Sequence, residues 1–214
     1  MLRPESSSVA SDRFLELARA RHGHFRLESG HHSDMWFDLN GLFTDHQRIA
    51  PLVTRLSDRL HDFRPDGVCG PLVGGAFLAQ RVAAELGVPF FFTERSAQPA
   101  RDELYTVRYR LPSVALPRVR HRRLAIVDDV MSAGSALRGT YASLREHDAD
   151  VVVAGALMVL GDVGATFFSS LNVPVEAVLM RPFNVWAPAE CPLCQRGSAI
   201  EDPVAVGTRL RLNR

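Results

Sequence analysis

Residues 124–136 have the sequence LAIVDDVMSAGSA, which joins an apolar run, two acids and a loop of small residues. The run Leu124–Val127 has the length and composition of a buried strand. Asp128 and Asp129 follow at its carboxyl end, which is where open α/β sheets bind their ligands. The small residues from Ser132 to Ser135 let backbone N–H groups approach an anion at the start of a helix. The segment therefore predicts a site for ribose hydroxyls beside a phosphate.

A purely structural interpretation of the same segment is also available. Strand, acid and small-residue turn recur throughout α/β proteins, and a single acid at a strand end often caps the following helix. The complete order is more specific, because two adjacent acids precede hydroxyl and small residues arranged around one glycine. We therefore favour the sugar-phosphate site over a helix cap.

The overall composition is that of one ordinary globular domain. The chain has 214 residues, of which 46% are hydrophobic and 23% charged, and its formal net charge is +1. Such a charge produces no long-range field that would attract nucleic acid. We find no apolar stretch of the ~18 residues that a membrane span needs, and no apolar core of a signal peptide near the N-terminus. We expect a cytoplasmic protein with neither a nucleic-acid nor a membrane partner.

Apolar strands alternate with helical patterns along most of the chain. The expected strands are Met35–Leu39, Gly67–Cys69, Val88–Phe92, Leu104–Leu111, Leu124–Val127, Val151–Leu160 and, as the last one, Val175–Leu179. The expected helices are Gln47–Phe63, Ala76–Leu86, Ser135–Glu146 and Gly164–Leu171, with a further apolar helical face around Phe14–Ala18. This alternation predicts an α/β fold with a doubly wound, mostly parallel sheet.

The three cysteines, Cys69, Cys191 and Cys194, do not form a disulfide framework. The CPLC segment at 191–194 has the spacing of half a zinc knuckle, but no second CxxC or histidine pair is evident to complete it. His24, His31 and His32 suggest a metal cluster as well, but we do not favour one there. We therefore assign no protein-bound metal, and we interpret Cys191 and Cys194 as surface thiols or an oligomer contact.

Three separated segments resemble type I phosphoribosyltransferases. Residues 125–136 resemble the family's phosphoribosyl-pyrophosphate motif, and GPLVGG at 70–75 resembles the loop placed against pyrophosphate. The segment Gly23–Asp34 is similar to the N-terminal signature of orotate phosphoribosyltransferases. Thr93-Glu94-Arg95, and the CPLC tail followed by Gly197, resemble a divergent bacterial and archaeal branch of those enzymes.

The resemblance implies how the chain is organised. The core would be the doubly wound sheet, and the turn at His32–Asp34 would belong to a small N-terminal hood over the site. We expect residues 1–45 to form an N-terminal helix and hood segment, residues 46–185 the phosphoribosyltransferase core, and residues 186–214 a tail with the CxxC. A homodimer is implied as well.

The resemblance also implies the chemistry, which is displacement of pyrophosphate from phosphoribosyl pyrophosphate by a nucleobase nitrogen, with Mg²⁺ as the cofactor. Asp128 and Asp129 would be catalytic, accepting hydrogen bonds from the ribose hydroxyls. Trp36 and Phe37 are candidates for contact with the base, with core packing as the alternative. The residues implied to bind phosphoribosyl pyrophosphate are Leu72, Val73, Gly74, Gly75, Arg95, Val130, Met131, Ser132, Ala133, Gly134, Ser135 and Ala136.

The best match for the acceptor is orotate, which would yield orotidine 5-phosphate for pyrimidine biosynthesis. Two departures keep alternatives open. Better-known orotate enzymes carry two lysines and a histidine in a mobile loop, whereas this chain has no lysine and its segment 95–102 offers only Arg95 and Arg101. Where those enzymes have an arginine for the orotate carboxylate, this chain has VLGD at 159–162. A transferase for another base, and a non-catalytic sensor of phosphoribosyl pyrophosphate, are the alternatives.

Overall fold

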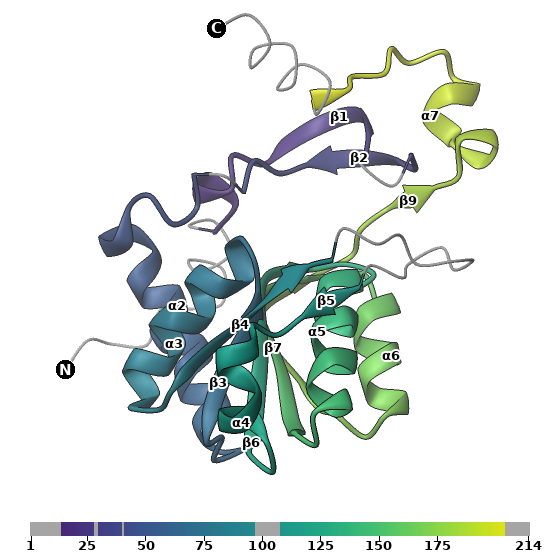
Figure 1. Cartoon of the computed structure of the whole chain (residues 1–214). Helices are drawn as coiled ribbons and strands as arrows, with labels where there is room; N and C mark the ends of the chain where they lie inside the picture. Colours follow the sequence, from purple (N-terminus) through teal and green to yellow (C-terminus); the bar gives the residue numbers. More distant parts are fainter. Residues whose placement is uncertain (1–13, 28–29, 40, 97–107, 204–214) are drawn as a thin grey trace, which may run out of the picture.

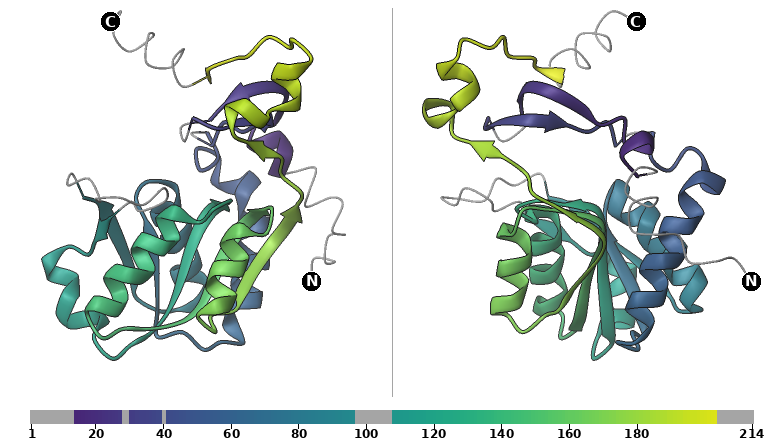
Figure 2. Two further views of the ribbon diagram at one scale, coloured as in Figure 1. Left: turned by 90° about the vertical axis from the view of Figure 1, so that its right-hand side faces the viewer. Right: turned by 180° about the vertical axis from the view of Figure 1, so that it is seen from behind.

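A large sheet with helices on both faces forms the body of the protein, and a small sheet stands over one of its edges (Figure 1). The computed structural model describes residues 14–27, 30–39, 41–96 and 108–203. The two further views show that the small sheet lies beyond the edge where the parallel strands of the large sheet end (Figure 2). That edge is the ligand-binding edge of an open α/β sheet.

The large sheet has the strand order β5-β4-β3-β6-β7-β8. Its central strands run parallel, and the short β5 joins one edge antiparallel to β4. The strands are β3 (Gly67–Pro71), β4 (Phe90–Arg95), β5 (Tyr109–Arg110), β6 (Arg123–Met131), β7 (Asp150–Leu160) and β8 (Val175–Arg181). The mostly parallel sheet expected from the sequence is therefore confirmed.

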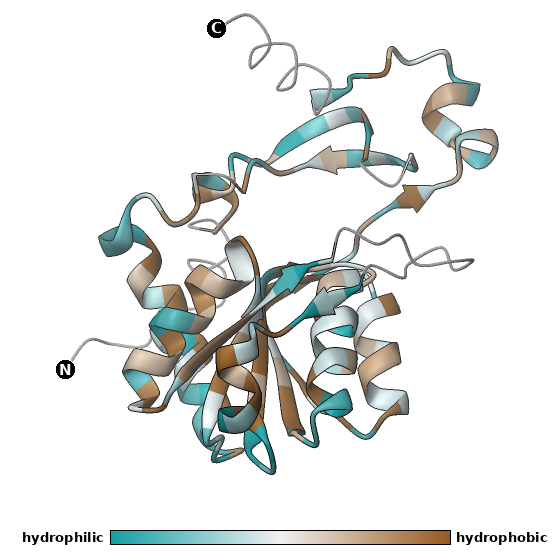
Figure 3. Ribbon diagram, in the orientation of Figure 1, coloured by the Kyte–Doolittle hydropathy of each residue, from teal (hydrophilic) through white to brown (hydrophobic). Residues whose placement is uncertain are grey.

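The helices cover both faces because successive side chains of a strand point to opposite sides of a sheet. On β6, Ala125 and Val127 pack in the core under α2 and α3, while Leu124 and Ile126 pack in the second core under α5 and α6. Hydropathy colouring shows these strands as largely apolar (Figure 3), as expected for strands buried on both faces. The helices are α2 (His46–His61), α3 (Gly74–Leu86), α5 (Ser135–Glu146), α6 (Val163–Ser170), the short α4 (Leu116–Val119) and the 3-10 turn η1 (Ser113–Ala115).

Several element bounds differ from those expected. β6 extends to Met131, because β7 continues to pair with it beyond Asp128, so both aspartates lie within the strand rather than after it. The strand expected at Met35–Leu39 is wrong in position, since β2 spans His32–Trp36. Of the strand expected at Leu104–Leu111, residues 104–107 lie outside the described part, and β5 covers Tyr109–Arg110.

Strand β8 is not the last, contrary to expectation. The two-residue β9 (Val185–Trp186) follows it and pairs with β2, which also pairs with β1 (Arg21–Arg26). A strand of two residues has too little pattern to be recognised in a sequence. Beyond β9 come the 3-10 turn η2 (Pro188–Glu190) and α7 (Pro192–Gln195).

The small subdomain, which we define as residues 21–27, 30–36 and 185–203, therefore combines both ends of the described chain. Its three-stranded sheet has the order β1-β2-β9. An isolated bridge between Phe25 and Glu201 ties the tail to β1 a second time. The division into residues 1–45, 46–185 and 186–214 stays a prediction, but its first and last segments share this subdomain.

Candidate active site

Asp128 and Asp129 lie side by side near the end of β6. Asp129 is 9% exposed and Asp128 is half-buried. The backbone N–H of Asp129 donates to Oδ1 of Asp128 (3.0 Å), and the N–H of Val130 donates to Oδ1 of Asp129 (2.8 Å). Burial raises the pKa of both carboxyls, and the neighbouring charge of Asp129 raises the pKa of Asp128 further. The pair is thus an acceptor-rich, partly desolvated site.

The glycine loop that follows β3 lies directly against these carboxylates. A Cβ atom added to Gly74 would stand 2.1 Å from Oδ2 of Asp129, and one added to Gly75 would stand 2.8 Å from Oδ1 of Asp128. A side chain at Gly74 would displace Asp129, and one at Gly75 would collide with both Pro71 and Asp128. The structure therefore brings together two of the three segments on which the resemblance rests.

Neighbouring contacts hold the glycine loop in place. The N–H of Leu72 donates to the carbonyl of Thr93 on β4 (2.8 Å), and the peptide bond between Leu72 and Val73 is cis. The hydroxyl of Thr93 is fully buried and shares a 2.7 Å hydrogen bond with that of Thr140 on α5. Leu72 and Val73 remain 41% and 65% exposed, so the loop's outer side faces solvent.

The second loop, residues 132–136, leads into the N-terminus of α5. Gly134 adopts a left-handed conformation with φ of 76°, and no side chain caps the helix there. The first N–H groups of a helix have no partner within the helix, and they carry its positive dipole end. A neighbouring contact supports the loop, because the N–H of Gly164 at the start of α6 donates to the carbonyl of Ser132 (3.0 Å). These features suit a phosphate.

Arg95 and Tyr109 form an opposed pair where β4 meets β5. Burial raises the pKa of the Tyr109 phenol, the charge of Asp128 raises it further, and Arg95 opposes both effects. Tyr109 therefore lies near both Asp128, a predicted catalytic acid, and Arg95, the predicted pyrophosphate cation. Tyr109 was not among the residues predicted from the sequence, where its place in the alternating segment Leu104–Leu111 was the available signal.

The two aromatic residues predicted to contact the base are half-buried, and each packs against another aromatic ring. Trp36 lies at the end of β2, with its ring centroid 6.5 Å from that of Phe25. Phe37 packs against the core under α2 and α3, with its ring 6.2 Å from that of Phe183. Contact of either ring with a base stays a prediction.

The donor chemistry at the end of β6 fits Mg²⁺. Paired carboxylates offer the hard oxygen ligands that this ion takes, usually together with water and substrate phosphates. Within the described ranges, the aspartate pair is not part of any group of three or more potential ligand side chains.

Comparison with known proteins identifies the family. A family model described as the phosphoribosyl transferase domain matches residues 41–174, which include the glycine loop, both aspartates and the loop before α5. The chain belongs to this family. Its activity is accordingly that of a pentosyltransferase, and the fold and family expected from the sequence are confirmed.

Individual relatives agree with this assignment. The chain is 33% identical over 179 residues to an orotate phosphoribosyltransferase of Pelotomaculum thermopropionicum, covering 82% of this chain and 85% of the relative. It is 27% identical over 191 residues to one of Caldanaerobacter subterraneus subsp. tengcongensis, covering 89% and 93%. The crystal structure of orotate phosphoribosyltransferase from Aeropyrum pernix shares the fold, with a TM-score of 0.63 at 20% identity over 81% of this chain and 92% of that chain.

Among the described residues, no helix is both long and apolar enough to cross a membrane. The cytoplasmic location stays a prediction.

Proposed function

We propose that this phosphoribosyltransferase transfers ribose 5-phosphate from phosphoribosyl pyrophosphate to orotate. The observation that carries the transferase chemistry is the contact between the Gly74-Gly75 loop and the Asp128–Asp129 pair. Support for orotate comes from the curated relatives, which are named orotate phosphoribosyltransferases and align over most of this chain. The product is orotidine 5-phosphate, the precursor of pyrimidine nucleotides.

In the reaction, the ring nitrogen of orotate attacks the anomeric carbon, the bond from that carbon to pyrophosphate breaks, and the nitrogen's proton is released. The anomeric centre becomes positively charged on the way. Catalysis then consists of positioning the reactants and stabilising this charge. Asp128 and Asp129 accept hydrogen bonds from the two ribose hydroxyls, and their negative charge favours the developing positive charge.

The two loops take the anionic groups on either side of the ribose. Residues 132–136 and the N-terminus of α5 bind the 5-phosphate through backbone amides. The N–H of Leu72 is already bonded to Thr93, so the amides of residues 73–75 donate to pyrophosphate. Arg95 supplies a positive charge, with Tyr109 beside it. Asp128 and Asp129 would be the protein groups nearest a bound Mg²⁺, which would supply positive charge to neutralise the leaving group.

An acceptor that carries a carboxylate needs a cation nearby. The loop after β7 has none at 160–162, but β8 ends at Arg181, which is opposite Leu160 in the register of the sheet. The N–H of Gly161 donates to the Arg181 carbonyl (2.9 Å), so the two strand ends are fixed together. We propose that the Arg181 guanidinium binds the orotate carboxylate. It would replace, from the adjacent strand, the arginine that better-known orotate enzymes carry in the region of residues 159–162.

A homodimer is part of the proposal. Leu72, Val73 and Phe77 are large apolar side chains that are 41% to 65% exposed around the start of α3. Covering such side chains is a common reason for association. Light scattering on the purified chain at several concentrations tests it, and a monomer throughout would refute it.

The test of the transferase is direct. The full chain is incubated with phosphoribosyl pyrophosphate, Mg²⁺ and, separately, orotate, uracil, adenine, guanine and hypoxanthine, and both pyrophosphate and nucleotide are measured. Orotidine 5-phosphate should form fastest. If another base reacts faster, that base rather than orotate is the acceptor. If the chain binds phosphoribosyl pyrophosphate tightly but turns over no base, it is a sensor and not an enzyme.

A further inference from the structure

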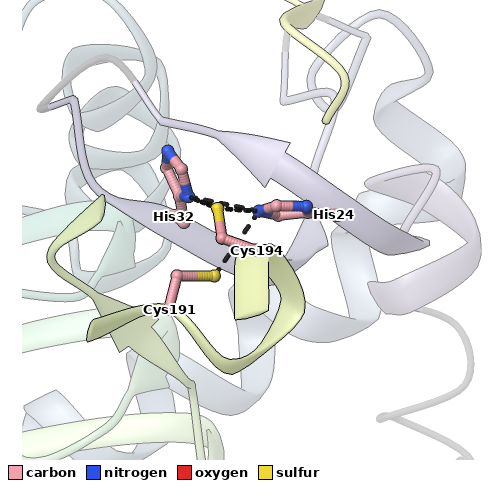
Figure 4. Close-up of side chains that lie close together, drawn as sticks. All are labelled: His24, His32, Cys191 and Cys194. Carbon is pink, nitrogen blue, oxygen red and sulfur yellow. Dashed lines mark hydrogen bonds between the residues drawn. The ribbon is translucent and has the colours of Figure 1, made fainter. Parts of the chain in front are cut away.

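We propose that His24, His32, Cys191 and Cys194 bind one structural zinc ion that joins the two ends of the chain. The four side chains converge from β1, β2 and the start of α7 (Figure 4). Each offers one ligand atom, and these atoms all lie within 4.8 Å of one another. The CxxC at 191–194 and the histidines of the N-terminal segment looked incomplete separately; together they make a Cys2His2 set.

The separations between the donor atoms match those around a zinc ion. Bond lengths of about 2.3 Å to sulfur and about 2.0 Å to nitrogen place tetrahedral ligand atoms about 3.3 to 3.8 Å apart. His24 Nε2 lies 3.1 Å from His32 Nδ1 and 3.4 Å from Cys191 Sγ. Cys194 Sγ lies 3.6 Å from His24 Nε2 and 3.2 Å from His32 Nδ1. All four distances are close to the edges of such a tetrahedron.

A neighbouring contact orients one of the ligands. The carbonyl of Ser198 lies 3.0 Å from Nδ1 of His24, so that nitrogen carries the proton and donates it. The neutral ring then has its lone pair on Nε2, which is the atom facing the other three ligands. A second hydrogen bond from the far ring nitrogen is the usual companion of a zinc-bound histidine.

The ligand types select the metal. Two sulfurs and two imidazole nitrogens in a closed tetrahedral set are typical of structural zinc, and do not suit Mg²⁺ or Ca²⁺. Binding converts both thiols to thiolates with release of two protons, so the ion and its ligands carry no net charge. A neutral set is compatible with the burial of His24, His32 and Cys191.

The small subdomain has little else to stabilise it. Five of its described side chains are buried, namely His24, Phe25, His32, Ser33 and Cys191, and only Phe25 among them is a hydrocarbon. The strand that the tail contributes, β9, has two residues. A metal that links positions 24 and 191 closes a very long loop, where such a crosslink limits the unfolded chain most. The ion therefore replaces a hydrophobic core in this part of the molecule.

The first test measures the metal in the intact chain. Protein purified without chelator or metal-affinity resin should contain about one zinc ion per chain. Replacement by Co²⁺ should give the visible absorption of a tetrahedral site together with a thiolate charge-transfer band. A chain without zinc that also fails to bind Zn²⁺ or Co²⁺ under reducing conditions would overturn the proposal, as would a Cys191–Cys194 disulfide in protein freshly isolated under conditions that prevent air oxidation.

Variants locate the ligands. Cys194→Ser changes the one exposed ligand, and it should lower zinc affinity by at least about tenfold without disturbing the core. His22→Gln is the matched control, because His22 is an exposed histidine on the same strand as His24. Undiminished zinc affinity in Cys194→Ser would overturn the assignment of Cys194 as a ligand. If a variant folds poorly, the Co²⁺ spectrum of the unaltered chain shows instead whether a tetrahedral thiolate site is present.

Hydrogen exchange tests the structural role. Removal of zinc from the full chain should speed amide exchange in residues 21–27, 30–36 and 185–203, while the central strands β3, β6 and β7 keep their protection. Equal exchange with and without zinc in the small subdomain would contradict the structural role. This test does not depend on transferase activity, so its outcome is separate from that of the proposed function.

Discussion

Gly74 and Asp129 are in such close contact that a Cβ atom on the glycine would stand 2.1 Å from Oδ2 of the aspartate. Gly74→Ala should therefore push the carboxylate away from the ribose hydroxyls. Since φ at this position is not positive, alanine introduces no backbone strain, and the effect comes from the collision alone. We expect kcat/KM for phosphoribosyl pyrophosphate to fall by at least about tenfold.

Gly41→Ala is the control for this substitution, because a Cβ there meets nothing within 4 Å. Its steady-state kinetics should equal those of the unaltered chain. Normal kinetics in Gly74→Ala would mean that the loop does not lie against the substrate site during turnover.

The two aspartates should matter far more for turnover than for folding. The double variant Asp128→Asn, Asp129→Asn keeps the shape of both side chains but removes both charges. Turnover should fall by about a hundredfold or more, the scale of losing electrostatic stabilisation in a transition state. Asp58→Asn, an exposed acid on α2, should leave turnover unchanged. A double variant that retains most of its activity would remove the catalytic role.

The same double variant should be more stable than the unaltered chain near neutral pH. Both carboxyls have a raised pKa in the folded state, because burial disfavours their charged forms. The folded chain therefore binds protons more tightly than the unfolded chain, and its stability falls as pH rises from the ordinary carboxyl pKa through the raised value. Asparagine removes this penalty, so the gain should be largest at neutral pH and disappear in acid. Thermal unfolding at several pH values measures it.

The shared hydroxyl hydrogen bond between Thr93 and Thr140 should stabilise the loop region. Thr140→Val leaves the fully buried Thr93 hydroxyl without that partner, which costs about 1 to 3 kcal/mol. The double variant Thr93→Val, Thr140→Val replaces both partners with apolar groups, and it should recover much of the loss. Urea unfolding of the three proteins tests this, and equal stability of single and double variants would contradict it.

The role proposed for Arg181 predicts that its loss affects orotate more than uncharged bases. Arg181→Gln should raise KM for orotate by about tenfold or more, the scale of one lost charge-assisted hydrogen bond, and leave KM for phosphoribosyl pyrophosphate nearly unchanged. Arg122→Gln, at the opposite end of the large sheet, is the control. If KM for orotate is unchanged in Arg181→Gln, another group binds the orotate carboxylate.

Much of the sheet was predictable because buried parallel strands and amphipathic helices have strong local patterns. Ser135–Glu146 was expected to be a helix, and α5 has those bounds. The end of β6 was not predictable, since its last residues are strand only because β7 continues beside them. The small subdomain was predicted least well, because β9 is short and most of the subdomain's buried groups are polar.

The sequence alone indicated the family, which the family model confirmed, and it predicted the local chemistry of LAIVDDVMSAGSA, because strand, acids and small-residue loop are neighbours along the chain. Tertiary structure determined which distant groups meet. His24 and Cys191 are 167 positions apart, yet their donor atoms lie 3.4 Å from each other. Such contacts depend on how the elements pack in space, and no local periodicity encodes them. For that reason the acids could be proposed from the sequence, whereas the glycine contact and the convergence of the four proposed zinc ligands became visible only in the folded chain.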